Sequence, residues 1–72
     1  MVDMEYVDSE SVDQIGYDDD QSEVHVIFKK GGAHYIYSDV PANTFEDFRN
    51  SPSKGKFVPE ILKGHGYSYR KV

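Results

Sequence analysis

One stretch of this 72-residue chain decides its fold: Glu23-Val24-His25-Val26-Ile27-Phe28-Lys29-Lys30-Gly31-Gly32-Ala33-His34-Tyr35-Ile36-Tyr37-Ser38. On both sides of the glycines, apolar side chains recur at every second residue. This pattern predicts two antiparallel strands joined by a tight hairpin turn. A loop at residues 31–32 would place Phe28 opposite Tyr35, whereas a loop at residues 30–31 would place Val26 there. In either register one face, which we predict to be the core, carries the same five side chains: Val24, Val26, Phe28, Tyr35 and Tyr37.

The segments on either side of this hairpin indicate an α+β domain. Ile15-Gly16-Tyr17 predicts a third strand, and the run of residues 18–22 that follows it is rich in turn-forming residues. Downstream, Pro41 suits the first turn of a helix that carries Phe45 and Phe48 one turn apart. We therefore expect a three-stranded antiparallel β-meander over residues 15–38, covered on one face by two short helical segments.

The second helical segment begins at Ser53, an N-cap type of residue, and carries apolar side chains at residues 57, 61 and 62. Pro59 interrupts it, because a proline removes one backbone hydrogen bond and clashes with the preceding turn. We expect either a kink at Pro59 or a turn at residues 53–57 followed by a short helix from the proline. In the tail of residues 67–72, aromatic and polar side chains alternate, so this tail is a candidate for a further edge strand.

The first twelve residues are acidic and carry only scattered apolar side chains. We expect residues 1–12 to be an arm, either frayed or a short edge element, and residues 13–72 to form a single domain. The beginning of the chain lacks the basic start and apolar run of a signal peptide. No stretch approaches the roughly 20 apolar residues that span a bilayer. We expect a cytoplasmic protein with no membrane partner.

Charge is distributed unevenly along the chain, although the net charge is −5. Residues 1–25 hold nine acids and no Lys or Arg, while residues 26–72 hold eight bases and four acids. The acidic total argues against indiscriminate nucleic-acid binding, because attraction to phosphates follows local positive charge. The second part of the chain still leaves room for a basic face. The alternative is that both sets of charges are simply solvated.

The run Ser53-Lys54-Gly55-Lys56 opens a predicted helical segment and is the most suggestive basic motif. Free backbone N–H groups and two lysines suit a phosphate, and Gly55 allows a close approach. The alternative is an N-cap with a solvated lysine pair. The glycine pattern of a Walker loop is absent. If the tail folds back beside this run, four more residues extend the candidate nucleic-acid-binding site: Arg49, Lys63, Arg70 and Lys71.

Tyr35 and Tyr37 permit two interpretations. Aromatic side chains on a sheet stack on bases in many RNA-binding proteins. Strand parity nevertheless points both tyrosines inward, which favours core packing with hydroxyls that reach a partner.

The sequence contains no signature of catalysis or of a metal site. Counted from Asp18, the sixth and twelfth positions hold Glu23 and Lys29, where an EF-hand needs glycine and glutamate. The three histidines do not stand at metal-ligand spacing, and the chain has no cysteine. No nucleophile elbow or triad motif is present. We expect a non-enzymatic protein with no cofactor, no metal and no catalytic residues.

Several of these pieces, in their order along the chain, resemble the KTSC domain, a family named for its occurrence at the C-terminus of some lysyl-tRNA synthetases. The resemblance runs from about Ser9 to Arg70. Its pieces are Ile15-Gly16-Tyr17, Val24-x-Val26-x-Phe28, Gly31-Gly32, Tyr35-x-Tyr37, Val40-Pro41, Ser53-Lys54-Gly55-Lys56-Phe57 and Ile61. The family also occurs as short bacterial and phage proteins, and its synthetase association implies RNA binding.

Two functional hypotheses follow. The first is a nucleic-acid-binding module, for RNA, that uses the basic C-terminal half of the chain. The second is a phage or mobile-element protein that binds and modulates a host protein. In the second, the acidic arm or the half-apolar sheet face around Ile27 and Ile36 would make the contact.

Overall fold

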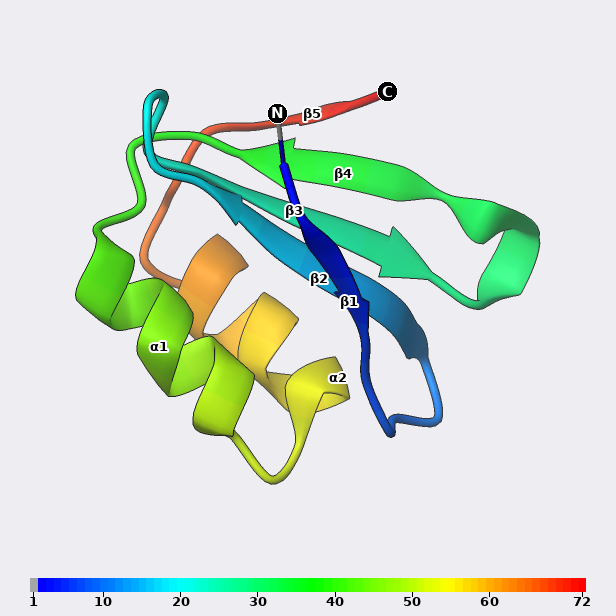
Figure 1. Ribbon diagram of the computed structural model, residues 1–72. Coiled ribbons are helices and arrows are strands. Elements are labelled where there is room, and N and C mark those ends of the chain that lie inside the picture. The colour runs from blue at the N-terminus through cyan, green and yellow to red at the C-terminus, as the bar shows by residue number, and fades with distance from the viewer. Residues whose placement is uncertain (1) are drawn as a thin grey trace.

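The computed structural model describes residues 2–72 as one five-stranded antiparallel sheet with helices on one of its faces (Figure 1). The strands lie in chain order: β1 (Met4–Tyr6), β2 (Val12–Asp18), β3 (Glu23–Phe28), β4 (His34–Tyr37) and β5 (Tyr69–Lys71). The predicted α+β class and the meander over residues 15–38 are confirmed as β2, β3 and β4. The predicted number of three strands is wrong, because β1 and β5 add one strand to each edge.

Both added strands are only three residues long, and the sequence left each of them open as an edge element without assigning it to the sheet. β1 pairs with β2 through Met4↔Gly16 and Tyr6↔Gln14, so part of the acidic arm is an edge element. β5 pairs with β4, and the N–H of Val72 also donates to the carbonyl of His34 over 2.8 Å. The two ends of the chain therefore complete opposite edges of the sheet.

The central hairpin adopts the second of the two predicted registers. Val26 lies opposite Tyr35, and Val24 lies opposite Tyr37. The connection is longer than the predicted two-residue loop, because a short 3-10 turn, η1 (Lys30–Gly32), lies between the strands. Gly31 and Gly32 have φ angles of 70° and 64°, a left-handed conformation that glycine adopts without steric cost.

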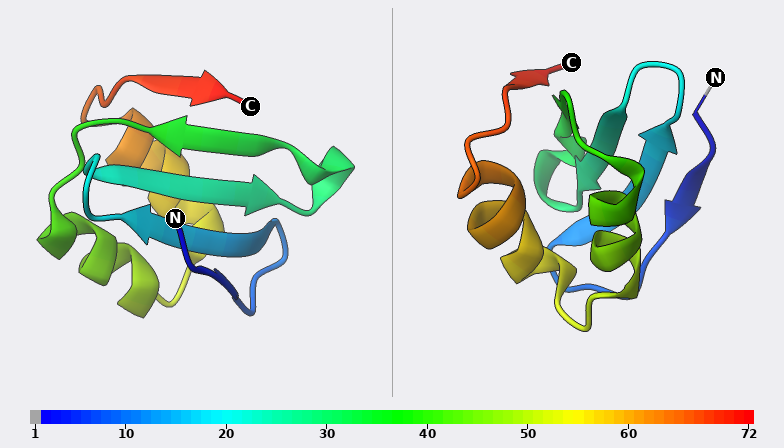
Figure 2. Two further views of the ribbon diagram at one scale, coloured as in Figure 1. Left: turned by 45° about the horizontal axis from the view of Figure 1, so that its top comes forward. Right: turned by 90° about the vertical axis from the view of Figure 1, so that its left-hand side faces the viewer.

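The helical layer consists of α1 (Ala42–Asn50), α2 (Lys54–Phe57) and η2 (Val58–Lys63), all on the same face of the sheet (Figure 2). Of the two alternatives expected around Pro59, the second is close to the structure: the single turn of α2 ends at Phe57, and the π-helix η2 follows directly and begins one residue before the proline. Proline has no N–H to continue the α-helical bonding, and a π-helix accommodates that gap. Ser53 is the residue before α2, but its side chain makes no capping hydrogen bond.

The core lies between this helical layer and the inner face of the sheet. Its buried residues are Val12, Ile15, Val24, Val26, Tyr37, Val40, Phe48, Val58 and Leu62. Phe48 is fully buried and stacks on Phe57 with ring centroids 4.9 Å apart. Tyr17 stacks on Phe45, and its hydroxyl donates to the carbonyl of Val40 over 2.6 Å. None of the helices in the described part of the chain has the length and apolar character to span a bilayer.

Candidate functional site

The eight residues of the predicted nucleic-acid site do not form one surface. They fall into three groups, at the end of α1, in the connection to α2, and near η2 and β5. The groups are Arg49; Ser53, Lys54, Gly55 and Lys56; and Lys63, Arg70 and Lys71. Each group has a different electrostatic environment.

Both arginines are bound to carboxylates from the N-terminal part of the chain. Arg49 Nε lies 3.0 Å from Glu5 Oε1, which ties α1 to β1. Arg70 forms a two-pronged pair with Glu23, with Nη1 2.9 Å and Nη2 3.4 Å from its oxygens. Arg70 also lies opposite Ile36 in the ladder, so it points to the sheet face that the helices leave uncovered. The charges of both arginines are therefore paired with carboxylates of the protein itself.

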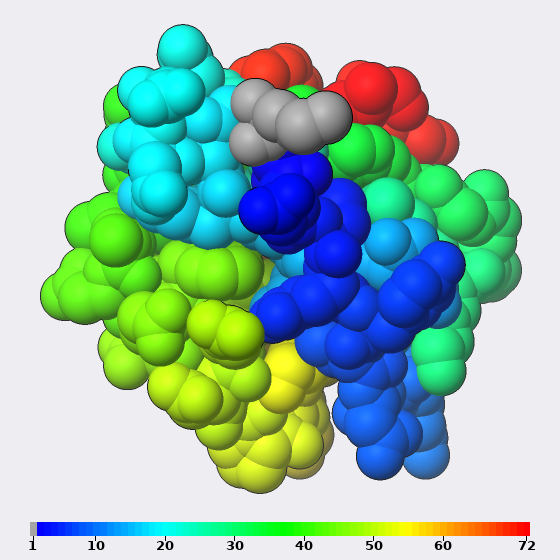
Figure 3. Space-filling model, viewed as in Figure 1, coloured from blue at the N-terminus to red at the C-terminus, as the bar shows by residue number. Residues whose placement is uncertain are grey.

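The Ser53–Lys56 run forms one wall of a cleft of about 440 Å³, and residues 8–11 form the other. Figure 3 shows this cleft between the blue β1–β2 loop and the yellow segment that begins α2. The second wall contains Asp8 and Glu10, so an anion in the cleft would meet carboxylates as well as lysines. Lys54 Nζ donates to the carbonyl of Ser51 over 2.8 Å. The cleft therefore favours phosphate less than its sequence suggests.

A second hollow, which we call the aromatic groove, lies between the sheet and η2 and has a volume of about 270 Å³. Its walls include Phe28, Tyr35, Tyr37, Tyr69, Pro59 and Lys63. The rings form a connected row with edge-on or tilted contacts: centroids are 5.7 Å apart for Phe28 and Tyr35, and 5.9 Å apart for Tyr35 and Tyr69. Such geometry matches the electrostatic preference of aromatic pairs.

Exposure increases along this row from the inside to the edge of the sheet. Tyr37 is 5% exposed and belongs to the core, as strand parity predicts. Tyr35 and Phe28 are half-buried, and Tyr69 on the edge strand is 51% exposed. Burial, reinforced by the phenols of Tyr69 and Tyr35, raises the pKa of the Tyr37 hydroxyl above its ordinary value. Tyr35 and Tyr69 thus offer ring surface to a ligand, whereas Tyr37 supports them from behind.

One lysine lines the aromatic groove, and three others stand next to its residues in the ladder or the chain. Lys63 lines it directly, and Lys71 lies opposite Tyr35 in the β4–β5 ladder, so both share its side of the sheet. Lys29 and Lys30 follow Phe28 at once in the hairpin and are exposed. Within residues 2–72, none of these four lysines forms an ion pair with a carboxylate. Lys54 and Lys56 form no ion pair with a carboxylate in this part of the chain either, but they line the cleft that also contains Asp8 and Glu10.

Sequence reasoning selected Lys63 and Lys71 but did not include Tyr69 or Phe28 in the site. The alternation Tyr67-x-Tyr69-x-Lys71 was the available signal. It identifies neighbours of Tyr35 only when the tail is placed as a strand beside β4.

A family model and a solved structure point to the same family. The KTSC domain matches residues 8–69. A curated protein of Tsukamurella paurometabola, which has only the name "Protein", is 37% identical over 60 residues, which cover 83% of this chain and 88% of that protein. The crystal structure of a KTSC domain protein from Yersinia pestis superimposes with a TM-score of 0.91 at 30% identity, and the match covers 100% of this chain and 99% of that one.

Proposed function

This chain belongs to the KTSC domain family, and we propose that it is a non-enzymatic module that binds single-stranded RNA in the aromatic groove. The observation that carries the proposal is the coincidence of exposed rings with unpaired lysines. Tyr69 and Tyr35 present ring surface, and Lys63 and Lys71 lie beside them without a carboxylate partner among residues 2–72.

Stacking supplies the first part of the binding energy. A base that stacks on an aromatic side chain contributes about 1–3 kcal/mol, with little dependence on its sequence. A groove of about 270 Å³ suits one planar ring rather than a duplex. Duplex RNA is recognised by its shape over a wide surface, whereas unpaired bases can enter a groove and stack. The proposed ligand is therefore single-stranded.

Lysines supply the second part, through the phosphates on either side of the stacked base. The net charge of −5 does not oppose this, because nine of the thirteen acids belong to residues 1–25 and none of the residues that line the groove is acidic. Asp18 ends β2, and Asp19 and Asp20 lie in the β2–β3 turn, at the opposite end of β3 from Phe28 and the hairpin lysines. Charges farther apart than the Debye length of about 8–10 Å are largely screened at physiological salt.

The test is a fluorescence anisotropy titration of labelled single-stranded RNA with matched variants. Tyr69→Ala should weaken binding by about tenfold, the size of one lost stacking contact. Lys63→Ala with Lys71→Ala should weaken it and lower the slope of log affinity against log salt by about two. Lys54→Ala with Lys56→Ala removes the same charge from the mixed cleft and should leave binding nearly unchanged.

Two outcomes would contradict the proposal. If the Lys54/Lys56 variant loses binding while the Lys63/Lys71 variant keeps it, the site is the helix-opening run rather than the aromatic groove. If the unmodified protein binds no single-stranded RNA, the function belongs to another class. If the chain then captures a protein from lysate, and the complex persists after nuclease treatment, the second hypothesis of a host-protein modulator is favoured.

A further inference from the structure

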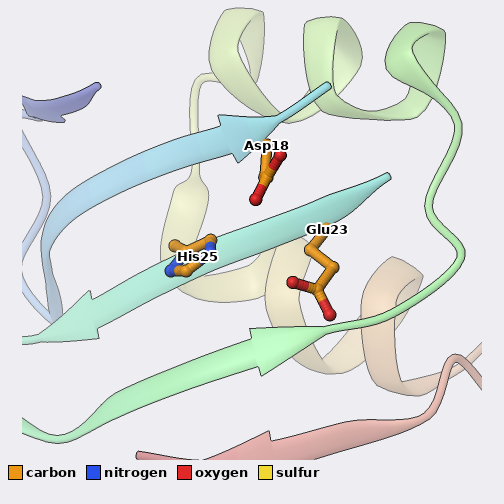
Figure 4. Close-up of side chains that lie close together, drawn as sticks. All are labelled: Asp18, Glu23 and His25. Atoms are coloured by element: carbon orange, nitrogen blue, oxygen red, sulfur yellow. The ribbon is translucent and has the colours of Figure 1, made fainter. Parts of the chain in front are cut away.

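The face of the sheet opposite the helices carries a cluster of side chains that suits a metal ion. Asp18 ends β2 directly opposite Glu23, and His25 is two residues further along β3, so all three point to the same face. One ligand atom from each lies within 4.8 Å of the others. Figure 4 shows both carboxylates on the same side of the His25 ring.

His25 is held in position by one ring nitrogen while the other is left without a partner. Its Nδ1 lies 2.9 Å from Nε2 of His34 on the neighbouring strand. Its Nε2 is buried and has no hydrogen-bond partner among residues 2–72. A buried ring nitrogen without a partner costs stability, and a fixed second nitrogen is how metal-binding histidines are commonly oriented.

The surroundings of His25 act on its imidazole in two directions. Burial lowers the pKa of its imidazole below the ordinary 6.5, and His34 lowers it further, although Glu23 and Asp18 act in the opposite direction.

We propose that Asp18, Glu23 and His25 form a binding site for a divalent transition-metal ion of the zinc class. One imidazole nitrogen and two carboxylate oxygens are a ligand set that zinc accepts, with water at the fourth position. Calcium and magnesium prefer oxygen ligands only. Ligands at 2.0–2.2 Å from zinc stand roughly 3–4 Å apart, so closure of the site needs side-chain movement of about 1 Å.

The turn that follows Asp18 and the side chain of Arg70 both contact the proposed ligands. Asp18 Oδ1 accepts hydrogen bonds from the N–H groups of Asp20 and Gln21 at 3.0 and 3.2 Å, which orients the carboxylate. Arg70 binds both oxygens of Glu23, so it competes with the ion for that ligand. The arginine also adds a positive charge that opposes a cation. We expect Arg70 to release one oxygen of Glu23 when the metal binds.

The signal for this cluster was partly present in the sequence. The three histidines do not stand at the spacing of ligands for one metal. The proposed ligand set instead combines one of them with two acids across a turn. Asp18 and Glu23 become neighbours only through the β2–β3 register. The site lies on the opposite face from the aromatic groove and does not rest on RNA binding.

The experiment is isothermal titration of the full chain with zinc sulphate in a buffer that does not chelate. The unmodified protein should bind one ion per chain. Asp18→Asn keeps the oxygen that accepts the turn hydrogen bonds but loses the charge, and it should weaken binding about tenfold or more. His25→Gln should do the same, and Arg70→Gln should strengthen binding severalfold because it frees Glu23.

Two control variants test whether an effect on zinc binding is specific to the three proposed ligands. Asp19→Asn removes an equal charge one residue away, and His65→Gln removes a histidine that stacks on Tyr67, far along the chain from this cluster. Both controls should bind zinc like the unmodified protein, and circular dichroism should show that every variant is folded. The proposal is overturned if the unmodified chain shows no stoichiometric zinc binding. It is equally overturned if Asp19→Asn or His65→Gln weakens binding as much as its counterpart.

Discussion

The gradient of burial along the aromatic groove predicts how much stability each tyrosine contributes. Tyr37 is 5% exposed and belongs to the core, so Tyr37→Ala should cost about 3–5 kcal/mol, the range for deletion of a buried ring. Tyr69 is 51% exposed, so about half as much of its surface leaves water on folding. Because the hydrophobic contribution scales with buried area, Tyr69→Ala should cost about 1.5–2.5 kcal/mol.

The size of the domain makes this difference decisive. At about 0.05–0.15 kcal/mol per residue, 72 residues have a free energy of unfolding of roughly 4–11 kcal/mol. Tyr37→Ala therefore removes much or all of the stability, whereas Tyr69→Ala leaves a folded protein whose RNA binding can be measured. Tyr37→Phe is the control, because it keeps the ring, and the Tyr37 hydroxyl makes no side-chain hydrogen bond within residues 2–72.

Urea denaturation followed by circular dichroism measures both costs on the same scale. We expect the transition midpoint to fall slightly for Tyr37→Phe, moderately for Tyr69→Ala and most for Tyr37→Ala. Equal losses for the two alanine variants would refute the reasoning, because they would mean that burial in this structure does not determine the contribution of each ring.

Three further predictions concern other contacts. With a chelator present, stability should rise with pH through the region of 6.5, because the lowered pKa of His25 means that the unfolded chain binds its proton more readily, and His25→Gln should flatten this pH dependence of the urea midpoint. Gly16→Ala should cost about 1–3 kcal/mol and expose the β1 amides to hydrogen exchange, because a Cβ there would lie 2.5 Å from Met4 Sδ and 3.0 Å from the carbonyl of Asp3. Tyr17→Phe should cost about 1 kcal/mol in the same urea titration, since it removes the hydrogen bond to Val40.

Most of the correct predictions about the core rest on strand parity, the alternation of side chains between the two faces of a sheet. Val24, Val26 and Tyr37 are core residues because alternation along a strand determines which face a side chain occupies, whatever the loop length. The helix that begins after Pro41 could be predicted equally well from the sequence, because Phe45 and Phe48 stand one turn apart. These features depend on neighbours in the sequence, and a single sequence contains that information.

The edge strands and the grouping of charges depend on contacts between distant residues. Residues 4–6 and 69–71 are strands only because β2 and β4 offer them unpaired backbone groups. Arg49 and Arg70 were assigned to a basic surface because the carboxylates that approach them most closely, those of Glu5 and Glu23, are far away in the sequence. The position of Tyr69 beside Tyr35 requires the same long-range placement of the tail.

The sequential order of the strands has a consequence for how the domain assembles. Strands that follow one another in the chain are also neighbours in the sheet, and no connection within residues 2–72 crosses over another strand. The central hairpin can therefore form first, with β2 joining next, and each later strand docks onto an edge that already exists. Contacts between nearby residues form quickly, so we expect β2, β3 and β4 to pair before β5, which meets β4 only after the helical segment between them. The three-residue strands β1 and β5 dock last and open first, which leaves the inner strands paired while the two edges exchange with solvent.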